Sequence, residues 1–302
     1  MNIHILEMPL DFGASRHGSD MGPSAMRLAG LKERLVQLNH TVQRHFSPVD
    51  LEPQEYANPG DPSLKYLKPI AKACSQLACE VEAAIEAGAF PLVLGGDHSI
   101  VLGSLAGLAA SHIRRGARIG VLNVDAHGDF NTDKTSLSGN IHGMCMAASC
   151  GYGVPELTAL HFDGRKVDPA NVCYVGLRDI DPEEKKLMKA AGVMAFTMSD
   201  IDRVGFPSVL REVSRFFRDR VDSVHVSFDM DVIDPMFAPG VGIPLPDGLN
   251  YREALLLMEE MFTTGQVRSA DFVEVNPILD VRNQTARMAV ELIARLLGDS
   301  IY

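Results

Sequence analysis

The chain has 302 residues, of which 46% are hydrophobic and 22% are charged, and its formal net charge is −11. This acidic excess disfavours nucleic acid and anionic membranes as partners, because both carry charge of the same sign. No apolar run reaches the roughly 20 residues of a membrane helix, and the N-terminal segment MNIHILEMPLDFG lacks the basic and apolar regions of a signal peptide. We therefore expect one cytoplasmic domain spanning residues 1–302.

Short runs of β-branched and apolar residues alternate with longer segments whose apolar residues recur every three or four positions. In chain order, the predicted strands are Asn2–Glu7, Pro91–Leu94, Arg118–Val124, Asn171–Gly176, Ser223–Phe228 and Ser269–Val275. The predicted helices are Tyr66–Ala87, Ile100–Arg114, Pro182–Ala191, Pro207–Arg218, Tyr251–Phe262 and Arg282–Leu297. Val49–Ser63 is rich in proline and acidic residues and is predicted to be a long surface connection. This alternation predicts an α/β fold of three αβα layers around a mainly parallel central sheet.

Ionisable side chains follow four of the predicted strands, at the carboxyl ends where open parallel sheets bind their ligands. The motif GGDHS contains His98, DAHGD spans Asp125–Asp129, DMD spans Asp229–Asp231, and Glu274 follows the last strand. Alternate side chains of an extended segment point the same way, so D-x-H-x-D presents three donor groups together and D-x-D presents two. These motifs predict a shared site at one edge of the sheet.

The donor set indicates a pair of metal ions. Four carboxylates in one place cannot all stay ionised without cations, and two divalent ions balance their charge. Carboxylates with some imidazole favour Mn²⁺, whereas structural zinc sites prefer thiolate and imidazole. Two such ions can share and activate a water molecule. The predicted ligands are His98, Asp125, His127, Asp129, Asp229 and Asp231.

Each motif alone has an ordinary structural explanation. A D-x-D segment commonly caps a turn or helix, a histidine at a strand end is commonly structural, and Gly95-Gly96 fits any tight turn. The metal site is favoured because three independent motifs occur at strand ends and form a charge-balanced ligand set.

The cysteines offer no competing site. None lies within the ligand motifs, and they form no CxxC pair. We predict reduced and mostly buried thiols at Cys74, Cys79, Cys145, Cys150 and Cys173.

The same motifs resemble those of the ureohydrolase family, and of the arginases within it. The resemblance begins at HGSDMGPSAMRLAGL (His17–Leu31), extends to the last predicted helix, and includes LGGDHS, VDAHGDFNT, SGNIHGM, GLRDID, HVSFDMDVIDP and FVEVNP. It implies an arginase-like fold and hydrolysis of L-arginine to L-ornithine and urea by a hydroxide that bridges two Mn²⁺ ions. It also implies a homotrimer or homohexamer.

The resemblance divides the six ligands between the ions. Each imidazole would bind a different Mn²⁺, and two carboxylates would bridge the pair. One ion would take His98 and Asp129, the other His127 and Asp231, and the bridges would be Asp125 and Asp229.

The resemblance also implies catalytic roles for three side chains. Asp129 would orient the nucleophile and accept its proton. Glu274 would pair with the guanidinium of the substrate and hold its central carbon near the nucleophile. His142, in SGNIHGM, would act as an acid or a proton shuttle.

Three further side chains match the positions that bind the amino acid end of arginine. Asn131 and Ser138 would bind the α-carboxylate, and Asp181, with Asp179 nearby, would bind the α-amino group. The alternative is another ureohydrolase, an agmatinase or a hydrolase of a different guanidino acid. A catalytically silent regulatory member is disfavoured, because all the ligand positions are filled.

The chain departs from the usual arginase pattern near the substrate loop and after the last metal motif. Asp133 and Lys134 stand in a stretch that is usually neutral, so an extra acid would lie beside the carboxylate-binding loop. Val232 replaces a smaller residue, and Asn250 stands where threonine or serine is usual. None of these positions is a metal ligand.

Overall fold

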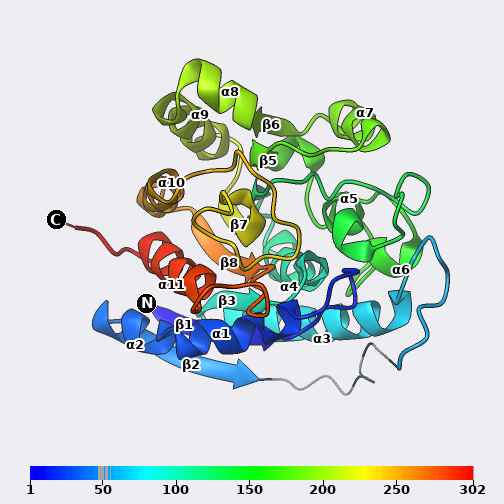
Figure 1. The fold of residues 1–302 in the computed structure, drawn as a ribbon, viewed down its shortest axis with the longest axis horizontal. Helices are drawn as coiled ribbons and strands as arrows, with labels where there is room; N and C mark the ends of the chain where they lie inside the picture. Colours follow the sequence, from blue (N-terminus) through cyan, green and yellow to red (C-terminus); the bar gives the residue numbers. More distant parts are fainter. Residues whose placement is uncertain (47–50, 52–53, 55, 302) are drawn as a thin grey trace.

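The computed structural model describes residues 1–46, 51, 54 and 56–301. The described strands form one eight-stranded sheet of order β2-β1-β3-β8-β7-β4-β5-β6, and all neighbours are parallel (Figure 1). The strands are β1 (Asn2–Met8), β2 (Thr41–Phe46), β3 (Phe90–Gly95), β4 (Ile119–Val124), β5 (Val172–Leu177), β6 (Met194–Thr197), β7 (Ser223–Asp229) and β8 (Val267–Val273).

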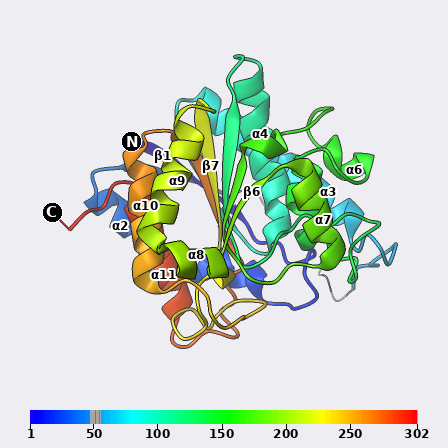
Figure 2. The ribbon, with the colours of Figure 1, turned by 90° about the horizontal axis from the view of Figure 1, so that it is seen from above.

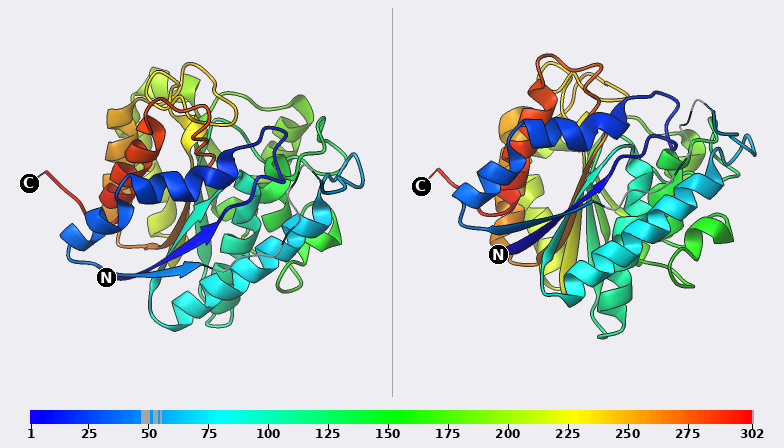
Figure 3. Two further views of the ribbon diagram at one scale, coloured as in Figure 1. Left: turned by 60° about the horizontal axis from the view of Figure 1, so that its bottom comes forward. Right: turned by 90° about the horizontal axis from the view of Figure 1, so that it is seen from below.

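Helices cover both faces of this sheet, which is seen nearly edge-on in Figure 2. One face packs against α1 (Gly22–Leu28), α2 (Leu31–Gln37), α8 (Met198–Val204), α9 (Phe206–Arg218), α10 (Tyr251–Thr263) and α11 (Gln284–Leu296). The other packs against α3 (Leu67–Glu86), α4 (Val101–Ile113), α5 (Cys145–Ser149), α6 (Pro155–Thr158) and α7 (Pro182–Ala191). Helices α1 and α11, from opposite ends of the chain, lie side by side (Figure 3). The predicted three-layer αβα fold is confirmed.

Two strands and several short helices were not predicted from the sequence. Strands β2 and β6 form the two edges of the sheet, and the side chains of β6 are only partly buried. Edge strands tolerate polar residues, so β2 (TVQRHF) lacks the apolar run of a central strand. The predicted connection Val49–Ser63 lies partly outside the described residues. Across the described part of the chain, no helix has the length and apolar composition needed to span a membrane.

The central strands place the predicted motifs side by side. Strands β3, β8, β7 and β4 are consecutive in the sheet, although they are far apart in the sequence. Strands β3, β4 and β7 are buried along their whole length, as expected for parallel strands covered on both faces. All four motifs therefore lie together, at the carboxyl ends of four neighbouring parallel strands.

Close packing of α3 against α4 requires small residues in α4. A Cβ atom added at Gly107 would lie 2.4 Å from the carbonyl oxygen of Ala78 and 2.7 Å from Cβ of Val81. We expect Gly107→Ala to force the helices apart and to lower the free energy of unfolding by about 1–3 kcal/mol. Urea denaturation of the metal-free protein measures this, and an unchanged midpoint would show that the helices separate without cost.

Candidate metal centre and substrate pocket

The ends of β3, β4 and β7 bring the six predicted ligands together. Five of them form two groups that share Asp125, and the donor atoms of each group lie within 4.8 Å of one another; the sixth, Asp129, lies 2.9 Å from Nδ1 of His98. The first group joins Asp125 to His98 and Asp229, and the second joins it to His127 and Asp231. A shared carboxylate between two imidazole-containing groups is an arrangement that suits a pair of neighbouring cations.

Hydrogen bonds fix the orientation of His98. Its Nε2 atom lies 2.8 Å from Oγ of Ser227, and the hydroxyl of Ser227 donates to Asp271 at 2.6 Å. In neutral His98 the serine oxygen therefore accepts a hydrogen bond from Nε2–H, which leaves the lone pair on Nδ1. That Nδ1 atom is buried without a hydrogen-bond partner and lies 2.9–3.3 Å from carboxylate oxygens of Asp125, Asp129 and Asp229.

The buried polar network continues below the site between β7 and β8. Asp271 also pairs with Nε2 of His225 at 2.8 Å, and Nδ1 of His225 lies 2.7 Å from Oγ of Ser269. Ser104 of α4 donates a further hydrogen bond to Asp271. Burial raises the pKa of Asp271, but His225 and the hydrogen bonds outweigh it, so the pKa is lowered overall. This network holds Ser227, and through it His98.

The electrostatics of the cluster favour bound cations. Burial, and then the charges of Asp231 and Asp125, raise the pKa of Asp229 well above its usual range. Burial lowers the pKa of His98, but the Cys145 sulfur and the carboxylates of Asp125, Asp129 and Asp229 raise it well above its ordinary value. Without cations the cluster must take up protons, whereas divalent cations would allow all its carboxylates to stay ionised. The residues present therefore fit a metal centre.

Two candidate site residues have an unusual backbone conformation. Asp129 and Glu274 have φ angles of 48° and 64°, in the left-handed region that residues other than glycine rarely adopt. Backbone strain of this kind costs energy and is concentrated at functional sites.

In the D-x-H and D-x-D segments, the Asp125 and Asp229 carboxylates accept hydrogen bonds from the backbone N–H two residues later, at 2.7 and 2.8 Å.

Glu274, which is buried, and His142, which is partly buried, form a pair beside the metal donors. Oε1 of Glu274 lies 3.2 Å from Nδ1 of His142 and accepts a hydrogen bond from the backbone N–H of His98 at 3.0 Å. Burial alone would lower the pKa of His142, but the hydrogen bond and charge of Glu274 raise it to about 9. The structure therefore joins two predicted catalytic residues that are 132 positions apart in the sequence.

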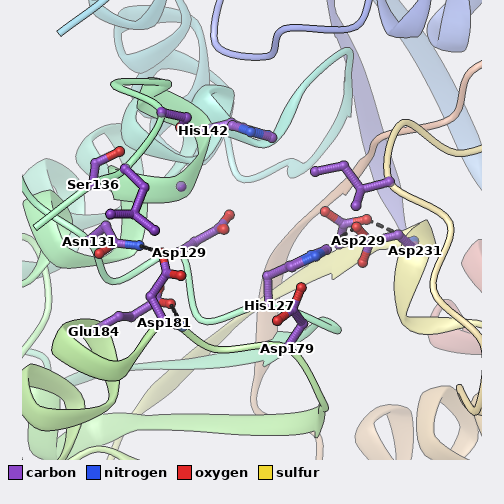
Figure 4. A pocket seen from close by; sticks show the side chains of 14 residues that line it. His127, Asp129, Asn131, Ser136, His142, Asp179, Asp181, Glu184, Asp229 and Asp231 are labelled. Carbon is purple, nitrogen blue, oxygen red and sulfur yellow. Dashed lines mark hydrogen bonds and ion pairs between the residues drawn. The ribbon is translucent and has the colours of Figure 1, made fainter. Parts of the chain in front are cut away.

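A hollow of about 210 Å³ connects the metal donors to the predicted substrate loop. In Figure 4, His127, Asp229 and Asp231 lie on one side of it, and Asn131 and Asp181 lie on the other. Sites for drug-sized ligands occupy roughly 300–1,000 Å³, so this volume suits a small metabolite. The pocket therefore has a metal end and a polar end.

The polar end contains the residues predicted to bind an amino acid. The side-chain amide of Asn131 donates to Asp181 at 3.0 Å, and its carbonyl oxygen accepts a hydrogen bond from Thr135 at 2.9 Å. Ser138 and Asp179 also line the pocket, and Ser138 is exposed. The hydrogen bond between Asn131 and Asp181 joins the loop after β4 to the start of α7.

Glu184 also lines this end of the pocket and was not predicted. Its carboxylate accepts hydrogen bonds from the backbone N–H groups of Phe130 at 2.7 Å and Asp181 at 3.1 Å. Burial raises the pKa of Glu184 to about 7. The only sequence signal for it is the spacing of a capping box, with Glu184 three residues after Asp181.

The departures from the arginase pattern lie away from the metal donors. Asp133 and Lys134 line a separate hollow that includes part of α7, and neither lines the pocket at the metal centre. Asn250 is the N-cap of α10, where its side chain accepts a hydrogen bond from the N–H of Glu253. Val232 is fully buried against Gly176. Asn250 and Val232 therefore have structural explanations.

The predicted free and mostly buried thiols are confirmed, but nothing in the sequence indicated that one of them lies beside the metal donors. Cys145 lies in a third donor group, with His98 and Asp129, whose ligand atoms all fall within 4.8 Å of one another. It was missed because it lies at the start of a helix, outside every strand-end motif. The other cysteines are also free thiols, and Cys79 alone among the five is exposed.

The fold and the donor groups together define a class, an α/β protein with a candidate metal centre at the carboxyl edge of its parallel sheet. Comparison with known proteins narrows that class. The sequence profile of the arginase family matches residues 1–298. The chain is 45% identical to arginase of Bacillus caldovelox over 299 residues, which cover 99% of both chains. The chain therefore belongs to the arginase family.

Solved structures agree with this assignment. The fold is similar to that of arginase from Bacillus cereus, with a TM-score of 0.94, 43% identity and complete coverage of both chains. It is also similar to Entamoeba histolytica arginase in complex with L-ornithine, with a TM-score of 0.90, 31% identity and 99% coverage of both chains.

Proposed function

We propose that this protein hydrolyses L-arginine to L-ornithine and urea. The observation that carries the proposal is the two-ended pocket, which has metal donors at one end and Asn131, Ser138 and Asp181 at the other. Similar chains named arginase, one of them bound to L-ornithine, support the same activity. A guanidinium at the metal end and a zwitterionic amino acid at the polar end match this layout.

The six ligands predicted from the sequence would hold two divalent cations, which we propose are Mn²⁺. His98 and Asp129 would bind one cation and His127 and Asp231 the other, with Asp125 and Asp229 shared between them. When bound, such cations would activate water as a nucleophile at neutral pH and stabilise negative charge.

The remaining steps fall to side chains around the cluster. Glu274 pairs with the substrate guanidinium and holds its central carbon near the nucleophile. Asp129 accepts a proton from the attacking water, and His142 delivers one to the departing amine as the bond from carbon to that nitrogen breaks. His142 is placed for the acid role by its contact with Glu274, which raises the pKa of His142 to about 9 in the metal-free protein.

Urea release from L-arginine, agmatine and 4-guanidinobutyrate, each with added Mn²⁺, tests the proposal. We expect arginine to be the preferred substrate. A clear preference for agmatine or the guanidino acid would replace arginine with another ureohydrolase substrate. Absence of urea from all three, together with less than one metal ion per chain, would indicate a silent regulatory member.

Replacing Asn131 tests how the carboxylate of arginine is recognised. Asn131→Asp would place a negative charge beside Asp181, 3.0 Å from the present amide, and would repel the substrate carboxylate. We expect KM for arginine to rise by about tenfold, which equals roughly 1.4 kcal/mol, with a smaller change for agmatine. Steady-state kinetics on both substrates measure the two KM values. An equal rise in KM for arginine and agmatine would show that Asn131 does not recognise the carboxylate.

We further propose that the chain acts as one domain, in the cytoplasm, as a homotrimer or homohexamer. These proposals rest on the family match over residues 1–298 and on the resemblance described above. Light scattering after size-exclusion chromatography would give the number of chains in the assembly.

A further inference from the structure

Cys145 is the first residue of α5 and is completely buried beside the metal donors. Its Sγ atom lies 3.5 Å from Oδ2 of Asp129. The start of α5 is anchored at this point, because the backbone N–H groups of Met146 and Ala147 both donate to the carbonyl oxygen of Asp129, at 3.0 and 3.3 Å. The thiol is therefore held next to a predicted metal ligand by the backbone itself.

The spacing of the donor atoms suits a common cation. Ligand atoms of Cys145, His98 and Asp129 all lie within 4.8 Å of one another, and Nδ1 of His98 is 2.9 Å from Oδ2 of Asp129. Metal–sulfur bonds of about 2.3 Å and metal–nitrogen bonds of about 2.0–2.1 Å place the ligands of one ion roughly 3–4 Å apart. The observed separation of 3.5 Å between sulfur and carboxylate oxygen falls in this range.

A second observation points to the same position. Nδ1 of His98 is fully buried and has no hydrogen-bond partner, and the hydrogen bond from Nε2 to Ser227 leaves its lone pair directed at the carboxylates. A buried polar atom without a partner is costly unless a ligand satisfies it. The Cys145 sulfur and the Asp129 carboxylate thus lie close to the unpartnered Nδ1 atom of His98.

We propose that Cys145 is a ligand of the cation held by His98 and Asp129. The thiol loses its proton to solvent when the cation binds, and the thiolate coordinates the ion. A thiolate is a softer donor than carboxylate or imidazole, so this position favours thiophilic ions such as Co²⁺ and Zn²⁺ more than a site built only from oxygen and nitrogen would. The proposal concerns the metal alone and does not depend on which guanidino substrate is used.

Cobalt absorption spectroscopy tests the proposal directly. The metal-free full-length protein is titrated with Co²⁺ to two ions per chain, and the near-ultraviolet region is searched for a sulfur-to-cobalt charge-transfer band. We expect the band in the unmodified protein and in Cys150→Ser, a control that replaces another buried cysteine close to α5. We expect its loss in both Cys145→Ser and Cys145→Ala, with two Co²⁺ still bound.

Each alternative outcome is decisive. No charge-transfer band in the unmodified protein with two Co²⁺ bound would overturn the proposal and leave the thiol as a hydrogen-bond donor to Asp129. Persistence of the band in both Cys145 variants would also overturn it, because the sulfur would then belong to another residue. Circular dichroism confirms that each variant is folded before its spectrum is interpreted.

Competition between Zn²⁺ and Mn²⁺ gives a second measurement. We expect Cys145→Ser to weaken Zn²⁺ binding by at least about tenfold while changing Mn²⁺ affinity much less. An equal loss for both ions would mean that Cys145 acts only on the general shape of the site. Dissociation constants from chelator competition provide this ratio without any measurement of urea.

Discussion

Replacement of Asp229 by alanine is expected to abolish urea production and to remove at least one of two metal ions per chain. Oδ2 of Asp229 lies 3.3 Å from the free nitrogen of His98, and its donor group includes Asp125. Loss of a shared ligand removes the charge stabilisation that a bound cation supplies, which is several kcal/mol. We therefore expect kcat to fall by at least about a thousandfold. Elemental analysis after Mn²⁺ loading measures the metal content, and urea release measures the rate.

Asp229→Asn separates metal binding from folding. The Asn side chain keeps an oxygen that can accept the hydrogen bond from the backbone N–H of Asp231, now 2.8 Å long. It also removes one charge from a cluster in which burial and neighbouring carboxylates raise the pKa of Asp229. The metal-free variant should melt at the same temperature or higher, while the rise in Tm on adding Mn²⁺ should shrink. Full metal content and rate would refute the shared-ligand role.

Glu274→Gln is expected to lower kcat/KM for arginine by about a hundred- to a thousandfold. Breaking a buried, hydrogen-bonded charge pair costs about 2–5 kcal/mol, and each 1.36 kcal/mol is a tenfold change in rate. The amide keeps the shape of the side chain and can still accept from the backbone N–H of His98. A nearly unchanged kcat/KM would exclude Glu274 as the partner of the guanidinium.

The same variant should also change the titration of His142. Glu274 raises the pKa of His142 to about 9, so His142 is protonated below that pH and loses its proton above it. Without the carboxylate, burial is no longer opposed by the strongest favourable partner, and the pKa should fall toward or below 6.5. NMR of the imidazole protons in metal-free protein measures this shift. His142→Asn is the control, because the shifting resonance must disappear in it.

The sequence was sufficient to predict the central strands of the sheet but not its two edge strands. Strands β3, β4 and β7 are apolar along their length because helices cover both faces, so their motifs were easily placed at strand ends. The edge strands β2 and β6 are polar or short, and their pairing depends on tertiary position, which local pattern does not reveal.

The residues of the candidate site likewise fall into those that the sequence predicted and those that it did not. Five of its six predicted ligands lie in D-x-H-x-D or D-x-D motifs, whose spacing predicted a shared direction, and His98 begins a short 3-10 helix soon after β3. Cys145 and Glu184 reach the site from helices, and no local pattern says which helix start faces the sheet edge. The placement of Asn131 and Asp181 at the substrate end was implied only by the family resemblance, and their hydrogen bond to each other was not predicted, because the two residues meet through the fold.

The hydrogen-bonded column of Ser227, Asp271 and His225 has a consequence for folding fidelity. Ser227 lies directly opposite Asp271, and His225 opposite Ser269, just beyond an irregularity in the pairing of β7 with β8. A slip of one residue would turn every side chain of a strand to the opposite face of the sheet. It would break the hydrogen bonds of Asp271 and His225 and leave both side chains buried without these partners, which is energetically costly. These polar contacts thus select one alignment of β7 with β8, and the same alignment positions Ser227 to orient the predicted metal ligand His98.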